Sequence, residues 1–172
     1  MKKTKITVTA SENRIGATTI KVLEAVGAEQ GIDEFIVTST QRKPRQQAAA
    51  MYENIANGRN IRYKWAGEQV CELCRQMRGA KADRKAVIDA MTRRIEELAG
   101  QGYRVSLHCV SDEQYDRTNV IDLSYYNLGD KAKDTIKAFA KRIEVVKIIQ
   151  PITPAVAIFD KGEPAIHLEI KQ

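Results

Sequence analysis

The sequence has few of the residues that build disulfide-rich or membrane-spanning folds. Its three cysteines are an odd, low count, which argues against a disulfide framework and for folding in a reducing compartment. No apolar run approaches the ~20 residues that span a bilayer. Residues 6–10, after a basic start, are too few and too rich in threonine for a signal peptide. We therefore expect a chain made in the cytoplasm without a signal peptide or membrane span, which reaches an external target only if exported or released.

The pair Cys71-x-x-Cys74 has the spacing of a redox or zinc motif, but its setting favours another role. The apolar residues around it, Val70, Leu73 and Met77, recur at helical spacing. No second CxxC is present to complete a four-sulfur site. We predict that both cysteines pack inside a helical core.

Glycine-rich loops and blocks of like charge are also missing. Gly27, Gly31 and Gly58 stand alone, which argues against a phosphate loop and a nucleotide site. The net charge of +6 suits an anionic partner, either nucleic acid or an acidic polymer such as a bacterial cell wall. Because the basic residues are dispersed, without a block interleaved with aromatics, nucleic acid is the less favoured of the two. The sequence does not address the oligomeric state.

Helical and strand periodicities follow one another in an order that indicates an α+β fold. The spacing of apolar residues predicts helices at about 17–29, 44–58, 67–78, 84–99 and 131–142. Alternating or β-branched runs predict strands at 5–9, 34–39, 103–109, 120–123, 145–149, 155–159 and 165–170. Because helices come mostly first and strands cluster at the end, we expect an antiparallel sheet with helices packed on one side.

The chain has only two histidines, His108 and His167, and both lie in predicted strands. Alternation places each of them on the face opposite the apolar residues of its strand, and it does the same for Asp122. If the strands are neighbours, two imidazoles and a carboxylate converge on one face of the sheet. Three protein ligands with an open fourth position are typical of a catalytic zinc site. The alternative from the pattern alone is that both histidines are ordinary residues of a half-solvated sheet.

Several short motifs occur in the order of a known family. Residues 37–48, which leave a predicted strand and enter a predicted helix, resemble the TSxxRxPxxQ segment of D-alanyl-D-alanine carboxypeptidase-like zinc peptidases. These peptidases share the hedgehog-like fold and include phage endolysin endopeptidases. Ser106-x-His108 is similar to the family's SxH strand, Asp122 follows in a strand, and His167 lies on the last strand of a terminal hairpin. The resemblance runs from Val37 to the C-terminal strand.

The resemblance implies a single peptidase-like domain over residues 1–172, with the hedgehog/DD-peptidase fold. It implies a zinc metallopeptidase that hydrolyses the peptides of bacterial peptidoglycan, with Zn²⁺ bound by His108, Asp122 and His167. Arg42, from its place in the family segment, would pair with a substrate carboxylate or stabilise developing negative charge. Ser106 would contribute to substrate binding.

The spacing of the acidic residues departs from the family pattern. The family places its aspartate closer to the first histidine than Asp122 lies here, so Asp116 is a rival for the third ligand. The family position of the catalytic acid is Pro164 in this chain. The nearest acid is Glu163, which we take as the candidate base, with Asp160 further off as the alternative.

Two alternative functions remain. The displaced acid suggests a peptidase-like binding domain that has lost hydrolysis, and the charge alone suggests a basic nucleic-acid-binding protein, which is the less favoured of the two. Against the family pattern, the segment at about 59–81 also reads as an extra helical insertion.

Overall fold

The computed structural model describes residues 3–149 and 165–172, apart from residues 11, 13, 60 and 62. The chain divides into two compact units. We call residues 1–41 together with 112–172 the sheet unit, and residues 42–111 the helical unit.

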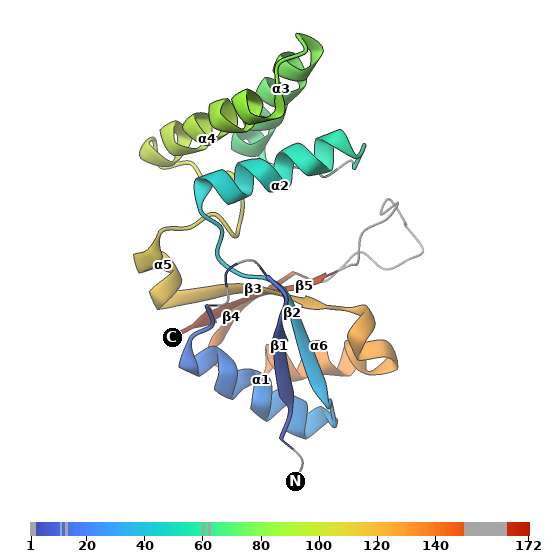
Figure 1. The fold of residues 1–172 in the computed structure, drawn as a ribbon. Helices are drawn as coiled ribbons and strands as arrows, with labels where there is room; N and C mark the ends of the chain where they lie inside the picture. The colour runs from blue at the N-terminus through green and yellow to red at the C-terminus, as the bar shows by residue number, and fades with distance from the viewer. Residues whose placement is uncertain (1–2, 11, 13, 60, 62, 150–164) are drawn as a thin grey trace. The chain divides into compact units, whose positions relative to one another are not determined.

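The sheet unit is built around five strands. They are β1 (Lys5–Val8), β2 (Glu34–Ser39), β3 (Thr118–Ser124), β4 (Val145–Ile149) and β5 (Ala165–Lys171), in the order β1-β2-β3-β5-β4 (Figure 1). β1 and β2 are parallel, and all other neighbours are antiparallel. The predicted α+β class is confirmed, but the predicted antiparallel sheet is wrong, because the sheet is mixed. The reason is the helix after β1, which carries the chain back along the sheet so that β2 starts at the same end as β1.

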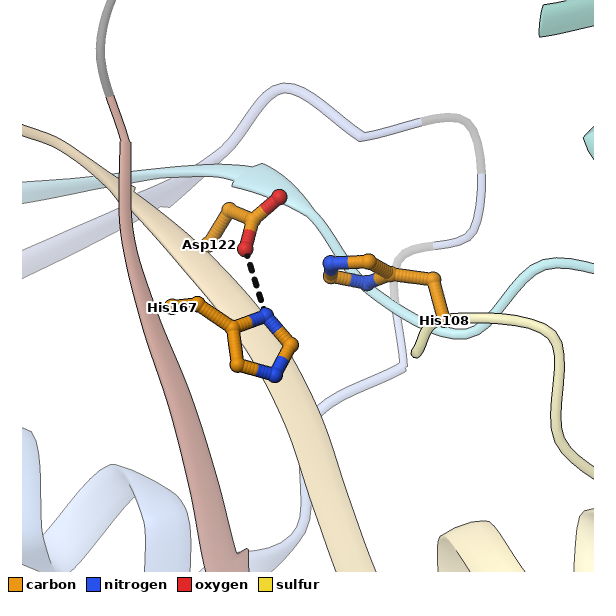
Figure 2. A group of neighbouring side chains, drawn as sticks. All are labelled: His108, Asp122 and His167. Carbon is orange, nitrogen blue, oxygen red and sulfur yellow. Dashed lines mark hydrogen bonds and ion pairs between the residues drawn. The ribbon is translucent and has the colours of Figure 1, made fainter. Parts of the chain in front are cut away.

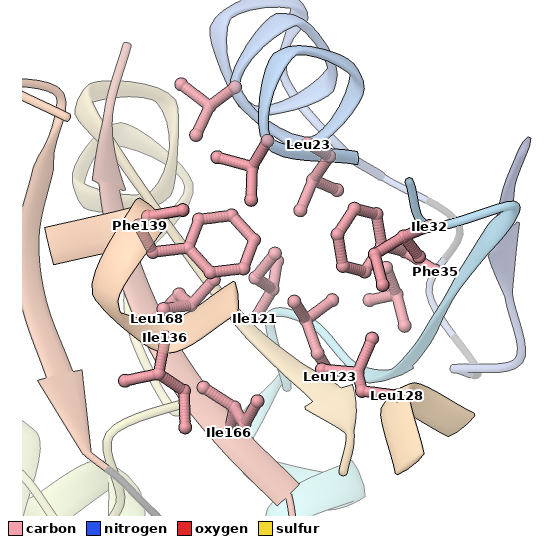
Figure 3. Close-up of a cluster of buried hydrophobic side chains, with 14 of the residues drawn as sticks. Leu23, Ile32, Phe35, Ile121, Leu123, Leu128, Ile136, Phe139, Ile166 and Leu168 are labelled. Atoms are coloured by element: carbon pink, nitrogen blue, oxygen red, sulfur yellow. The ribbon is translucent and has the colours of Figure 1, made fainter. Parts of the chain in front are cut away.

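Two helices of the sheet unit pack on the same face of the sheet. They are α1 (Ala17–Gln30) and α6 (Ala132–Ala140), the latter entered through the 3-10 helix η1 (Tyr126–Lys131). Leu23 and Val26 of α1 are fully buried, whereas Ile20 of the same helix is 37% exposed. Figure 3 shows the helices and strands meeting in one core, in which the rings of Phe35 and Phe139 lie 5.8 Å apart.

The helical unit consists of α2 (Pro44–Ala56), α3 (Trp65–Gly79) and α4 (Arg84–Gly100). Its core includes Cys71 and Cys74, so the pair packs inside the helices as predicted. Burial raises the pKa of the Cys71 thiol to about 11, and it raises that of Cys74 as well. Within the segment at about 59–81, Trp65–Gly79 forms α3. That this segment is an insertion relative to the family stays a prediction.

The predicted strand at 103–109 is wrong, because these residues form irregular turns. Val105 is buried in the helical core, as the inward residue of a strand would be. The backbone carbonyls of this segment, however, accept hydrogen bonds from groups outside any sheet. The Arg104 side chain donates to the carbonyls of Ser106 and Leu107, and the backbone N–H of Arg42 donates to the carbonyl of His108. Backbone groups satisfied in this way need no strand partner.

The segment after the turns lies outside the predicted helices and strands. Asp112–Arg117 within it is a helix, α5, which leads directly into β3. The predicted strand at 155–159 and the turn at 160–164 lie outside the described residues. Among the described residues, none of the helices has the length and apolar character to cross a membrane.

Candidate metal site

Asp122 and His167 are direct cross-strand partners on β3 and β5. The Nδ1 atom of His167 lies 3.0 Å from the Oδ1 atom of Asp122, as the dashed line in Figure 2 marks. The side chain of His167 is 9% exposed and that of Asp122 is 20% exposed. Residues directly opposite on antiparallel strands have Cβ atoms about 4.5–5.5 Å apart, so the register of the two strands accounts for the contact.

The apolar residues of the two strands determine where this pair lies. Ile121 and Leu123, which flank Asp122 on β3, are fully buried. The alternating apolar residues of β5 are also fully buried, namely Ile166, Leu168 and Ile170. Because side chains alternate along a strand, burial of these residues directs Asp122 and His167 to the other face. A slip of one residue would bury the carboxylate and imidazole in the core, which strongly selects this register. The predicted face of both residues is confirmed.

His108 is held by a tight turn rather than by a strand. Its backbone N–H lies 3.4 Å from the Ser106 hydroxyl oxygen, and the Ser106 carbonyl accepts from the N–H of Cys109 at 3.2 Å. The His108 carbonyl accepts from the N–H of Arg42 at 2.8 Å. The residue is buried, with 6% of its surface exposed. Alternation along a strand was therefore the wrong reason for singling out His108.

The three side chains His108, Asp122 and His167 form a group that could hold a metal ion (Figure 2). Each offers one ligand atom, and these atoms lie within 4.8 Å of one another. Zinc bound at ~2.0–2.2 Å in a tetrahedral site separates its ligand atoms by about 3.4 Å. Two imidazoles and a carboxylate suit zinc among the common divalent metals, and other first-row metals also accept such ligands.

The rival ligand Asp116 has a different environment. It lies on α5 and forms an ion pair with Arg14, and 58% of its side chain is exposed. It is not among the three side chains of the group. Of the two aspartates that the sequence left open, Asp122 is the one that lies beside His167.

The other predicted site residues are only partly described. Arg42 precedes α2 and is half-buried, and its Nη1 atom lies 3.4 Å from the Oε1 atom of Gln47. Ser106 is half-buried and belongs to the turn that holds His108. Glu163 and the alternative base Asp160 lie outside the described residues.

Glu169 and Lys147 extend the polar face beside His167, and no role was predicted for either. The Oε1 atom of Glu169 lies 3.6 Å from Nε2 of His167 and 3.1 Å from Nζ of Lys147. Glu169 stands two residues after His167 on β5, so alternation alone could have indicated it. Lys147 could not have been found this way, because its place depends on the pairing of β4 with β5.

Comparison of the chain with protein families, with curated proteins and with solved structures finds no match. The class of protein is therefore defined here by its α+β fold and by a group of side chains that could bind a metal. Any finer assignment depends on these residues and on the sequence resemblance.

Proposed function

We propose that this chain is a zinc-dependent peptidase that hydrolyses peptide bonds in bacterial peptidoglycan peptides. The observation that carries the proposal is the contact of Asp122 with His167 on the polar face of β3 and β5, within a group that includes His108. Two imidazoles and one carboxylate leave a position open for water, which is typical of catalytic rather than structural zinc. The sequence resemblance supports the peptidase activity, its substrate and the hedgehog-like fold.

Each residue has a distinct part in the proposed reaction. Bound zinc would lower the pKa of a water molecule towards ~7 and polarise the scissile carbonyl. Glu163 would accept a proton from the water and deliver it to the departing amine. Arg42 would pair with a carboxylate of the substrate or with the developing negative charge, for which its guanidinium offers several N–H donors. The parts of Glu163 and Arg42 rest on the resemblance.

Metal analysis tests the site. We expect the purified protein, reconstituted with zinc and freed of excess metal, to contain one zinc per chain by mass spectrometry. His108→Ala, Asp122→Ala and His167→Ala should each lose it, because each removes one of three ligands. Asp116→Ala is the matched control and should keep the metal. The proposal fails if the wild type binds no zinc, or if Asp116→Ala loses zinc while Asp122→Ala retains it.

Hydrolysis separates an enzyme from a domain that only binds. Purified peptidoglycan peptides should be cleaved by the zinc-loaded protein, and Glu163→Gln should abolish cleavage while zinc is retained. Asp160→Asn serves as the control for the alternative base. The second candidate function is a peptidase-like binding domain, which the proline at the family's acid position favours. Zinc binding without any hydrolysis by the wild type would support that candidate and overturn the enzyme.

A further inference from the structure

We propose that Glu169 is a positioning residue, which holds the imidazole of His167 so that its Nδ1 atom is available to the metal. This inference rests on the proposed metal site. Glu169 lies on the same strand and the same face as His167, two residues further along β5.

The two nitrogens of the His167 ring have different neighbours. Nδ1 lies 3.0 Å from Asp122, and Nε2 lies 3.6 Å from Glu169. A neutral imidazole carries one N–H, and the group that accepts it decides which nitrogen keeps a free lone pair. At 3.6 Å the Glu169 oxygen lies beyond hydrogen-bond distance of Nε2, whereas the 3.0 Å contact of Nδ1 with Asp122 is a hydrogen bond. If a metal takes Nδ1 and the Asp122 carboxylate, the ring proton must sit on Nε2, and Glu169 is the carboxylate placed on that side to accept it. Metal-binding histidines almost always donate their other ring N–H to such an acceptor.

Lys147 fixes the Glu169 carboxylate in place. Lys147 of β4 is the cross-strand partner of Glu169, and its Nζ atom lies 3.1 Å from Glu169 Oε1. Only 14% of the Glu169 side chain is exposed. An acceptor that is largely buried and held by an ion pair loses little further freedom when it orients a neighbouring ring.

The position of Glu169 also distinguishes it from a metal ligand or a catalytic base. It lies on the Nε2 side of the ring, whereas Asp122 lies on the Nδ1 side, and it is not part of the group that could hold the metal. A carboxylate on that side contacts the ligand rather than a water bound to the metal. Its effect should therefore appear in the strength and geometry of metal binding.

The test compares two replacements of Glu169 in the full chain. Glu169→Leu removes the acceptor, and we expect zinc affinity, measured by chelator competition, to fall about 10–100-fold. The visible absorption bands of the cobalt-substituted protein should shift as well. Glu169→Gln keeps an acceptor oxygen and should restore most of the affinity. Lys171→Gln, at the exposed end of the same strand, is the control and should bind zinc like the wild type.

A second readout reports the proton itself. Because the chain has only two histidines, ¹⁵N spectra of the zinc-loaded protein can assign each ring nitrogen. His167 should show its N–H on Nε2 in the wild type. Glu169→Leu alone would leave the ammonium of Lys147 on β4 without its carboxylate and could therefore impair folding. The double variant Glu169→Leu with Lys147→Met removes both charges and should show the same loss of affinity.

The outcomes separate this inference from the proposed function. Absence of zinc from the wild type overturns the metal site itself. If the wild type binds zinc through His167 but Glu169→Leu matches its affinity and its cobalt spectrum, Glu169 is only part of a surface ion pair and this inference is wrong. An N–H on Nδ1 of His167 in the zinc-loaded protein would also overturn it.

Discussion

At the scale of single residues, the candidate site depends on which face of a strand a side chain occupies. Asp122 and His167 lie on the face of their strands that is opposite the face of the fully buried apolar residues, and the same alternation places Glu169 on the face of His167. These three positions could be predicted locally. His108 was also singled out by its residue type and motif, but the strand that was to carry it is a turn. Its burial comes from contacts that alternation does not describe.

The buried cysteines provide a prediction at this scale. Burial raises the pKa of Cys71 to about 11, and it also raises the pKa of Cys74 and Cys109. Below its pKa a thiol is mostly protonated and unreactive, so Cys71 of the folded protein should alkylate slowly at pH 8 and faster only as the pH approaches 11. Cys74 and Cys109 should also alkylate more slowly than in the unfolded protein. Mass spectrometry after iodoacetamide treatment measures this, and the urea-unfolded protein, in which all three should react readily, is the control.

The same cysteines also test the choice of metal site. Replacing Cys71 and Cys74 together by alanine should leave the zinc content unchanged, because both side chains pack in the helical core. A loss of zinc in this variant would show that the CxxC pair, rather than the His108, Asp122 and His167 group, binds the metal.

At the scale of elements, helices with clear end signals were predicted best. Asp83 caps α4 by accepting a hydrogen bond from the N–H of Ala86 at 2.9 Å, and Gly31 ends α1 in the left-handed conformation. Both helices begin and end within one residue of their predicted bounds. Strand β2 was predicted with its correct bounds. The segment 103–109 was wrongly predicted to be a strand, because apolar residues also alternate with polar ones where a loop packs one side against helices.

Removing the cap of α4 should destabilise the protein. We expect Asp83→Ala to lower the free energy of unfolding by about 1 kcal/mol, because the N–H of Ala86 loses its partner. Urea unfolding followed by circular dichroism measures the change. Glu96→Ala, at an exposed position of the same helix, should alter stability by less than about 0.5 kcal/mol. Equal effects of the two substitutions would contradict a capping role.

The packing of α1 against the start of β1 depends on a glycine. A Cβ atom at Gly27 would lie 2.3 Å from the Thr4 hydroxyl oxygen, which itself donates to the carbonyl of Ile32 at 3.0 Å. We expect Gly27→Ala to destabilise the protein by about 1–3 kcal/mol, since the helix must move or the hydrogen bond must break. Gly79→Ala, where a Cβ would meet nothing within 4 Å, is the control for thermal unfolding and should be close to neutral. A stable Gly27→Ala protein would show that this contact is loose.

At the scale of the whole molecule, the charge is unevenly divided. Residues 42–111 contain 14 basic and 7 acidic residues, a net charge of +7, while the remaining residues contain 14 basic and 15 acidic, a net charge of −1. The helical unit therefore accounts for the positive charge of the chain. If the protein acts on carboxylate-rich peptidoglycan, this unit should contribute most of the attraction to it.

Binding to purified peptidoglycan tests this division of charge. Lys64→Gln with Arg93→Gln, both exposed in the helical unit, should weaken binding at low salt by about two- to thirtyfold, at roughly 0.2–1 kcal/mol for each exposed ion pair. Lys21→Gln with Lys133→Gln, both exposed in the sheet unit, carry the same change in net charge and should have a smaller effect. Binding should also fall as salt increases, because salt screens exposed charges. Equal losses in the two double variants would contradict the prediction.

What the sequence alone determined about this protein is local. Caps, apolar spacing and alternation identified the α+β class, most helices, and the strand faces of Asp122 and His167, because these signals depend on neighbours within a few residues. Only the tertiary structure decided that β1 runs parallel to β2, that Asp122 lies directly opposite His167, and that Lys147 pairs with Glu169. Strand order and register join residues far apart in the chain. They are set by how a whole sheet buries its core, which no short segment encodes.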